Sequence, residues 1–123
     1  MKKTEMLKKN YEFKKVLTKG KFLSKEKIGI VVLKNNKNIN FLGIAVSTKN
    51  GKSFLRNKAK RLIRESYKIL EERLIQGNSI VILLKKNVDI KNLKFKEVFY
   101  EMEELFKDTK IIKKEDVLWK NFL

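Results

Sequence analysis

The chain has 123 residues, a formal net charge of +17, no cysteine and no histidine. These numbers exclude a disulfide framework, argue against a zinc site, and remove the side chain that most often acts as a general base. A hydrophobic fraction of 42% is enough for one core, and no apolar run approaches the roughly 18 residues of a membrane-spanning helix. Since no apolar stretch follows the basic N-terminus, we expect one cytoplasmic domain over residues 1–123, with no membrane partner.

The first part of the chain carries one helix signal and two strand signals. Residues 10–19 place their apolar side chains on one helical face, with Asn10 as the expected N-cap and Gly20 as the stop. Residues 27–34 and 39–47 are short, apolar and rich in β-branched side chains, which is typical of strands. Because a polar turn separates them, we interpret these two strands as a hairpin.

The second part of the chain predicts a long basic helix, a buried strand and a further helix. The basic helix is expected to begin with Ser53 as its N-cap and to run to about residue 74. Residues 79–84 are apolar throughout and predict a buried strand. Apolar side chains at helical spacing over residues 95–106 predict an amphipathic helix. Four acids are assigned to its solvated face: Glu97, Glu101, Glu103 and Glu104.

The order of elements is therefore helix, strand, strand, helix, strand, helix. It indicates an α+β fold, a two-layer sandwich in which helices cover one face of a mixed sheet. The tail, residues 108–123, has no clear pattern. We interpret Val117, Leu118 and Trp119 as one more turn packed on the domain.

The most informative segment is residues 56–65. Stepping 100° per residue along the predicted helix separates two arcs, of which one spans about 140° and is polar. The polar arc holds Arg56, Asn57, Lys60, Arg61, Arg64 and Lys68. The opposite arc holds Ala59, Leu62, Ile63, Ser66 and Leu70. Glu65 is the single acid of the segment, and cations without acidic partners repel one another, so this face is better suited to a polyanion than to water.

The charge of the whole chain is unevenly distributed. Residues 1–70 contain 20 Lys or Arg and 4 Asp or Glu, whereas residues 71–123 contain 11 and 10. A basic half joined to a neutral half is typical of a nucleic-acid-binding protein. An anionic membrane surface is the rival partner, but it requires an apolar helix face that is free to enter lipid, and here that face is needed for the core.

No self-sufficient catalytic site is visible in the sequence. The basic half contains too few acids for a two-metal nuclease, namely Glu5, Glu12, Glu26 and Glu65. The glycine-containing loop at residues 50–53 lacks the spacing of a P-loop. We therefore predict no catalytic residue and no metal ligand, and a protein that acts by binding.

Three segments also match motifs of a known family. Arg56-Asn57-Lys58, followed by Lys60-Arg61 and Arg64-Glu65, resembles the RNR-x-KR-x-x-R(E) signature of the bacterial ribonuclease P protein component. Asn10 and Phe13 resemble its K-N-x-x-F-x-x-V first helix, and residues 43–49 resemble its G-x-x-V-S-K-K segment. The three segments occur in order and at matching spacing, and the resemblance covers about residues 7–107.

The resemblance implies an α/β sandwich with a left-handed β-α-β crossover, whose helix carries the basic signature. It also implies a small non-catalytic subunit, with one protein per large catalytic RNA, that assists removal of the 5′ leader from precursor tRNA. The RNA and its bound Mg²⁺ ions would perform the hydrolysis, so Mg²⁺ is the expected cofactor and is held mainly by the RNA. The chain is then part of an endoribonuclease for tRNA 5′ maturation and a single RNA-binding domain.

The resemblance also assigns roles to two sets of residues. Contact with the catalytic RNA is implied for the signature residues, to which we add two neighbouring lysines: Arg56, Asn57, Lys58, Lys60, Arg61, Arg64, Lys52 and Lys68. Contact with the single-stranded leader is implied for a cleft formed by Phe13, Lys14, Leu17, Val31, Ser47 and Lys49. An aromatic ring such as Phe13 can stack on an unpaired base, although it can equally be a core residue of a short helix.

Several positions depart from the family pattern. Lys58 stands where the signature has Arg, which removes bidentate phosphate binding at that position. Phe41 replaces a frequent Arg, and Thr48 replaces a usual Lys. Aromatic side chains common in the family's leader cleft are replaced by aliphatic ones at Leu17, Ile28 and Val31. Leader contacts are then expected to depend more on Phe13 and nearby cations, or the cleft to be less selective.

Two other readings stay open. The first is a ribosomal-type protein that binds folded RNA and has no role in cleavage. The second is a stand-alone nuclease or a DNA-binding protein. The ordered three-segment match favours the ribonuclease P subunit over the first. The missing histidine and clustered acids argue against a nuclease, and no helix-turn-helix or zipper pattern supports DNA binding.

Overall fold

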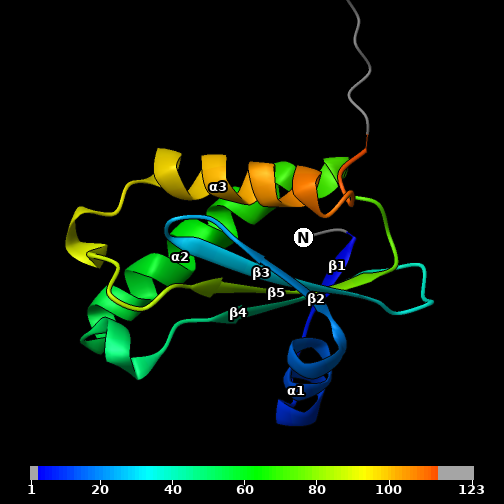
Figure 1. Ribbon diagram of the computed structural model, residues 1–123, viewed down its shortest axis with the longest axis horizontal. Helices are drawn as coiled ribbons and strands as arrows, with labels where there is room; N and C mark the ends of the chain where they lie inside the picture. The colour runs from blue at the N-terminus through cyan, green and yellow to red at the C-terminus, as the bar shows by residue number, and fades with distance from the viewer. Residues whose placement is uncertain (1–2, 114–123) are drawn as a thin grey trace, which may run out of the picture.

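A computed structural model of the protein describes residues 3–113, which form a five-stranded sheet and three α-helices (Figure 1). In chain order the elements are β1 (Thr4–Met6), α1 (Asn10–Lys19), β2 (Lys21–Ser24), β3 (Ile28–Lys34), β4 (Asn40–Ala45), α2 (Ser53–Leu70), β5 (Asn78–Leu84) and α3 (Phe95–Asp108). Three 3₁₀ turns lie between them, η1 (Thr48–Asn50), η2 (Glu71–Arg73) and η3 (Ile90–Asn92). The α+β class is therefore confirmed, whereas the expected turn at Trp119 lies outside the described residues.

The strand order across the sheet is β1-β4-β5-β3-β2. β1 and β5 run parallel to β4, and β3 runs antiparallel to both β5 and β2, so the sheet is mixed as predicted. The interpretation of β3 and β4 as a hairpin is wrong, because β5 lies between them. β5 is apolar on both faces, and a strand with that composition is most stable at the centre of a sheet.

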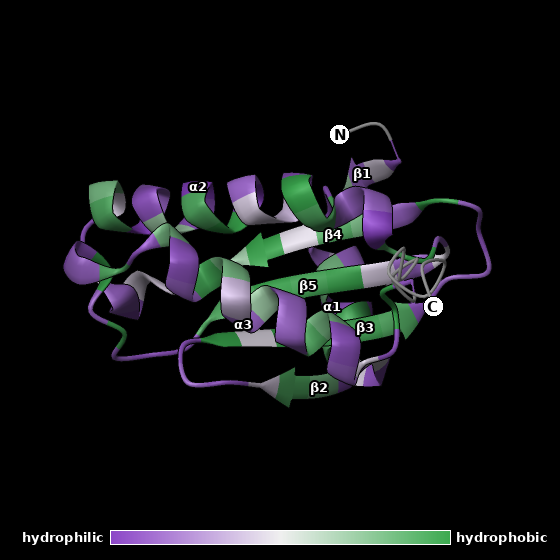
Figure 2. Ribbon diagram, turned by 90° about the horizontal axis from the view of Figure 1, so that it is seen from above, coloured by the Kyte–Doolittle hydropathy of each residue, from purple (hydrophilic) through white to green (hydrophobic). Residues whose placement is uncertain are grey.

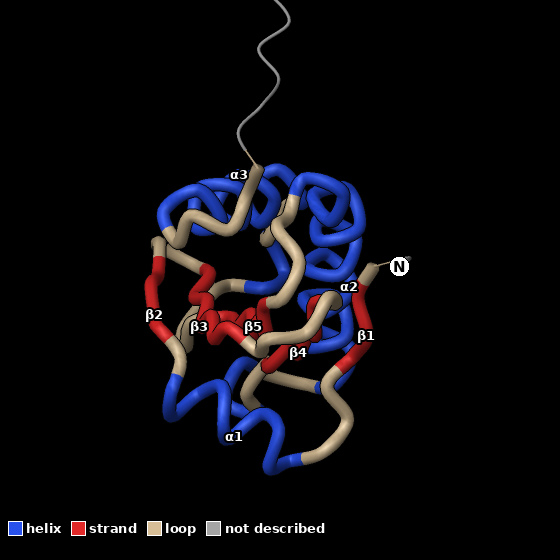
Figure 3. Tube along the Cα trace, turned by 90° about the vertical axis from the view of Figure 1, so that its right-hand side faces the viewer, coloured by secondary structure: helices blue, strands red, loops and turns tan. Residues whose placement is uncertain are grey.

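Helix α2 connects the parallel strands β4 and β5, which makes a β-α-β crossover. Viewed from the α2 side with both strands pointing upward, β5 lies to the left of β4 (Figures 2 and 3). The crossover is therefore left-handed, as the resemblance implies and against the strong general preference for the right hand.

Helices cover both faces of the sheet, not one face as predicted. Figure 3 shows α2 and α3 on one side of the strands and α1 on the other. Under α2 and α3 lies the larger core, which includes Ile28, Ile30, Leu42, Ile80 and Ile82. Under α1 lies a smaller cluster of Leu7, Val16, Val31 and Val81. The two clusters follow from the period of two along apolar strands, which gives β3 and β5 an apolar surface on each face.

The helix ends differ slightly from the predictions. Lys9 and Lys52 occupy the N-cap positions, so that Asn10 and Ser53 are the first helical residues and not the caps. Gly20 ends α1 as predicted, with its N–H donating to the carbonyl of Val16. The α-helical part of the basic helix ends at Leu70, and the chain continues through η2.

Strands β1 and β2 were not predicted, because both are short and polar at the edges of the sheet. β1 is held by its pairing with β4 and by a hydrogen bond of 2.7 Å between the hydroxyls of Thr4 and Tyr67. Burial raises the pKa of Tyr67 to about 12, so its hydroxyl stays protonated in this contact.

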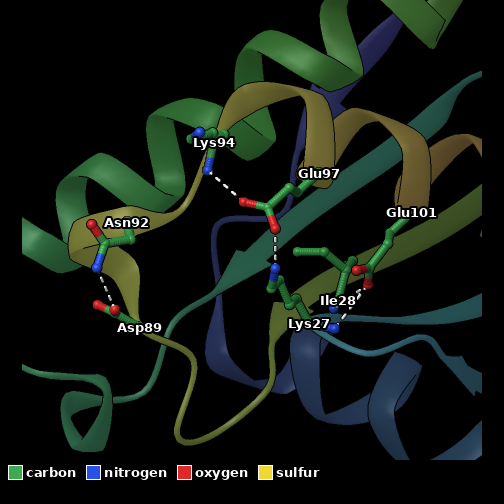
Figure 4. Close-up of polar contacts among 7 residues, drawn as sticks. All are labelled: Lys27, Ile28, Asp89, Asn92, Lys94, Glu97 and Glu101. Atoms are coloured by element: carbon green, nitrogen blue, oxygen red, sulfur yellow. Dashed lines mark hydrogen bonds and ion pairs between the residues drawn. The ribbon is translucent and has the colours of Figure 1, made fainter.

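The acids of α3 are not all solvated, which corrects a second prediction. Glu101 is only 8% exposed, and its carboxylate accepts the backbone N–H groups of Lys27 at 2.8 Å and Ile28 at 3.0 Å (Figure 4). One turn earlier, Glu97 pairs with the Lys27 ammonium and accepts the backbone N–H of Lys94 at 3.0 Å. The Lys27 hydrogen bond is the main cause of a lowered pKa at Glu97. These contacts fix α3 against the start of β3.

Candidate nucleic-acid interface

Helix α2 has the two faces that its sequence predicts. The residues of the apolar arc are all buried: Ala59, Leu62, Ile63, Ser66 and Leu70. On the polar arc Asn57, Arg61, Arg64 and Lys68 are exposed, and Arg56 and Lys60 are partly exposed. The buried arc packs on the sheet and α3, which fixes the direction in which the cations point.

The positive charge of this face is nearly uncompensated. Glu65 lies 3.9 Å from Arg61, and exposed pairs of this kind contribute little stability. Within residues 3–113, no ion pair reaches Arg56, Lys60, Arg64 or Lys68. Lys52 lies at the N-cap and is exposed. An array of free cations on a rigid helix is a suitable surface for a row of phosphates.

Two residues assigned to RNA contact also bind the protein itself. The Arg56 Nε donates to the carbonyl of Gly51 at 3.2 Å. The Lys58 Nζ donates to the carbonyls of Ile90 at 3.0 Å and Lys91 at 2.9 Å. Lys58 therefore ties α2 to η3, and two of its three donors are committed to that contact.

The residues assigned to the leader cleft lie mainly on the α1 side of the sheet. The Phe13 ring is partly buried and packs so closely on Gly43 that a Cβ there would overlap it. Lys14 and Leu17 are exposed on α1, whereas Val31 is only 3% exposed beneath it. Phe13 is thus a packing residue that is also partly at the surface, and its contact with the leader stays a prediction.

Ser47 and Lys49 lie just after β4, at η1. The Ser47 hydroxyl accepts the backbone N–H of Lys49 at 3.1 Å and caps this turn. A groove of about 670 Å³ opens at the carboxyl ends of β4 and β5, lined by Ala45, Ser47, Lys60, Leu83 and Lys86 among others. One residue from each predicted set, Ser47 and Lys60, lines this groove, so the two sets meet there.

Three exposed or groove-lining residues near the predicted sets were not predicted from the sequence. Lys85 and Lys86 follow the buried strand β5 and line the groove, and the carboxyl ends of adjacent parallel strands share one edge. That rule would have found them, had β4 and β5 been recognised as parallel neighbours. Phe22 on β2 is 55% exposed on the α1 side, and a single aromatic residue in a short polar strand gives no periodic signal.

A sequence profile of the ribonuclease P family matches residues 1–110. The chain belongs to the family of ribonuclease P protein components. Among its relatives, the ribonuclease P protein component of Clostridium botulinum strain 657 is 41% identical over 93 residues, which are 75% of this chain and 84% of the relative. That of Natranaerobius thermophilus is 35% identical over 108 residues, covering 88% and 92%.

Solved structures of the family have the same fold. The ribonuclease P protein of Staphylococcus aureus matches with a TM-score of 0.77 and 27% identity, over 88% of this chain and 97% of that one. The protein of Thermotoga maritima matches with a TM-score of 0.77 and 29% identity, over 85% and 96%. Family membership makes the chain a protein subunit of an endoribonuclease that has an RNA partner and supports tRNA 5′ processing.

Within residues 3–113, no three His, Cys, Asp or Glu side chains come together as a metal site would need. Over the same residues, no helix combines the length and the apolar character that crossing a bilayer requires. The charged groups at the interface are ammonium and guanidinium groups, which suit phosphate.

Proposed function

We propose that this chain binds the catalytic RNA of ribonuclease P through α2 and holds the 5′ leader of precursor tRNA on the α1 side of the sheet. The exposed cations of α2 bind phosphates of the folded RNA, with Arg61 and Arg64 as bidentate contacts. Lys52, Arg56 and Lys60 extend this contact to the groove. One protein binds one RNA, in the cytoplasm.

The leader, in this proposal, crosses from the groove onto the sheet. Ser47, Lys49 and Lys86 meet its phosphates beside the cleavage site, and Phe13 with Leu17 offers apolar surface to an unpaired base. The hydrolytic chemistry would come from Mg²⁺ bound by the RNA, which would activate water and offset charge at the phosphate. The protein's own contribution is to position the substrate, which raises the fraction of complexes ready to react.

The observation that carries this proposal is the groove that Ser47 and Lys60 line together. Lys60 of α2 lines it together with Ala45 and Leu83, which pack against the cluster under α1. This supports one molecule holding an RNA and a strand that leaves it at the same time. A protein that only binds folded RNA needs the first surface and not the second.

The test is cleavage of a 5′-extended precursor tRNA by a bacterial ribonuclease P RNA at low Mg²⁺, with and without this protein. We expect the protein alone to be inert and the combination to cleave at the mature 5′ end. Binding of the RNA without any change in cleavage would favour the ribosomal-type alternative. Cleavage by the protein alone would contradict the absence of catalytic residues.

A further inference from the structure

A pocket on the α3 side of the sheet has no part in the proposed function. It has a volume of about 390 Å³, within the range of roughly 300–1,000 Å³ that is usual for binding pockets. It lies where β2 and β5 begin and β3 ends, beside the chain that follows α3. None of its lining residues belongs to the basic face of α2 or to the predicted leader cleft.

The base of this pocket is apolar and incompletely covered. Val32 on β3 is partly buried and packs on the larger core. Ile111, just after α3, is 6% exposed. Ile75, between η2 and β5, is 44% exposed, although it lines the same pocket. Covering Ile75 with another apolar side chain would be favourable, because it would remove apolar surface from water.

Three lysines line the pocket together with these apolar side chains. Lys21 stands directly opposite Val32 in the pairing of β2 with β3, and Lys34 lies two residues after Val32 on β3. These three side chains therefore point to one face of the sheet. Lys110 belongs to a turn after α3, where its φ is 61°. All three lysines are exposed, and within residues 3–113 no ion pair reaches them, so the pocket combines apolar surface with uncompensated positive charge.

The backbone after α3 fixes the point from which the following residues start. The N–H of Ile75 donates to the carbonyl of Ile111 at 2.7 Å, and the N–H of Lys113 donates to the carbonyl of Arg73 at 2.6 Å. Since Ile111 lines the pocket, Lys113 lies within about 7 Å of a lining residue. Residues 117–119 come four to six positions later and can extend about 13–20 Å from Lys113. They can therefore reach the pocket.

The sequence of the following segment complements the pocket. Glu115 and Asp116 are followed directly by Val117, Leu118 and Trp119. Two acids beside three apolar side chains match lysines beside an apolar surface. A single-stranded RNA could use the same lysines, but no lining residue is aromatic, so its bases would have nothing to stack on. A segment of the same chain is also present at a high effective concentration, which favours it over a free partner.

We propose that this pocket docks residues 115–119 of the same chain. The apolar side chains of the segment cover Ile75 and Ile111, and its two acids pair with Lys34 and Lys110. This inference can be right or wrong independently of the proposed function, because the two share no residue.

The test uses Trp119, which is the one tryptophan of the chain, so that its fluorescence reports on this segment in the whole protein. In the wild type we expect blue-shifted emission and protection from acrylamide quenching. Ile75→Asp is expected to lower the ratio of docked to free segment roughly tenfold or more, because it removes apolar contact and adds an acid beside Glu115 and Asp116. Ile69→Asp makes the same change at an isoleucine of α2 that is 58% exposed and does not line the pocket, and it is the matched control.

A charge exchange distinguishes this pocket from other apolar surfaces. Glu115→Lys with Asp116→Lys is expected to expose Trp119 to acrylamide, because the segment then meets lysines of the same sign. Lys34→Glu with Lys110→Glu is expected to do the same. Combining the four changes restores opposite charges and is expected to restore the protection of Trp119. Circular dichroism and urea unfolding check that each variant is folded.

Four outcomes would overturn the proposal. The first is a wild-type Trp119 that is as open to acrylamide as free tryptophan. The second is protection that neither Ile75→Asp nor the charge exchange alters, which would mean that the segment docks elsewhere. The third is protection that disappears on dilution, which would indicate a contact between two copies of the chain. The fourth is that Lys34→Glu with Lys110→Glu weakens binding of a short single-stranded RNA and leaves Trp119 unchanged, which would assign the pocket to nucleic acid.

Discussion

The two faces of the sheet differ in how completely helices cover them. Two helices of 18 and 14 residues lie on one face, where Ile28, Ile80 and Ile82 are fully buried. The other face has only α1, with 10 residues, which is about 15 Å of helix across a five-stranded sheet. Leu17 and Phe22 therefore stay exposed there. We call these the closed face and the open face. The difference is one of packing: the closed face holds the larger core, and the open face leaves apolar side chains at the surface.

The largest expected effect is on the closed face. Ile63→Ala removes a fully buried side chain of α2 and is expected to lower the free energy of unfolding by about 3 kcal/mol. Leu17→Ala, on the open face, is expected to lower it by less than about 0.5 kcal/mol. Urea unfolding of both variants measures the difference. Equal losses would mean that the open face is part of the core, and the comparison would fail.

A substitution of Glu101, whose carboxylate is buried, tests how α3 is held on the closed face. Glu101→Ala leaves the N–H groups of Lys27 and Ile28 without their acceptor and is expected to cost about 2 kcal/mol. Glu104→Ala on the same helix is the control, because its contact with Lys107 is long, at 3.8 Å, and partly exposed. A loss no greater than that of the control would show that the Glu101 carboxylate does not help to hold α3 against β3.

The polar arc of α2 should affect binding and not stability. Arg61→Ala with Arg64→Ala is expected to weaken binding to ribonuclease P RNA at least tenfold, with the fold intact. The slope of log K against log salt should become less steep by about 2. Lys58→Met is the comparison variant and should change the slope less, since its ammonium already binds two carbonyls. Unfolding of the double variant would contradict the assignment of the two faces.

The smallest expected effect is electrostatic. The pKa of Glu97 is lowered by Lys27, so this pair stabilises the fold above the ordinary carboxyl pKa of 4.5. That contribution is lost as the pH falls through the lowered value. The pKa of Lys27 is raised, chiefly by its hydrogen bond to Glu97, so the lysine's contribution is complete below 10.5 and is lost at higher pH. Glu97→Gln should therefore differ from the wild type at neutral pH and converge with it as the pH falls below the lowered pKa of Glu97, as followed by thermal unfolding. A constant difference would mean that packing, and not charge, holds Glu97.

The features that could be predicted from the sequence are those that depend on local periodicity. The faces of α2 were predicted correctly, because each side chain's direction depends only on its place in the helix. The pairing of β4 with β5 was not, because strand neighbours depend on the whole chain. Glu101 was misplaced for a related reason. It lies one turn after Val98, at the margin of the apolar arc, and only the unpaired N–H groups at the start of β3 make that position favourable for a carboxylate.

The candidate nucleic-acid interface divides in the same way, into residues that local patterns predict and residues that only contacts between elements reveal. Motif spacing predicted Arg61, Arg64 and Ser47, because they belong to segments with recognisable patterns. The sequence did not reveal that Lys58 binds η3 or that Phe22 reaches the open face, because both depend on contacts between separate elements. Val31 was assigned to the leader surface, but its side chain is buried. The exposed side chain opposite it is Phe22 on the adjacent strand β2.

The pairing of β1 has a consequence for how the protein is made. Thr4 leaves the ribosome well before its partners, Asn40 in β4 and Tyr67 in α2. β1 can therefore pair only after β4 and α2 have been synthesised. Long-range pairing of this kind slows folding. An extension that holds the N-terminus away would leave the edge of β4 open and the Tyr67 hydroxyl without its partner.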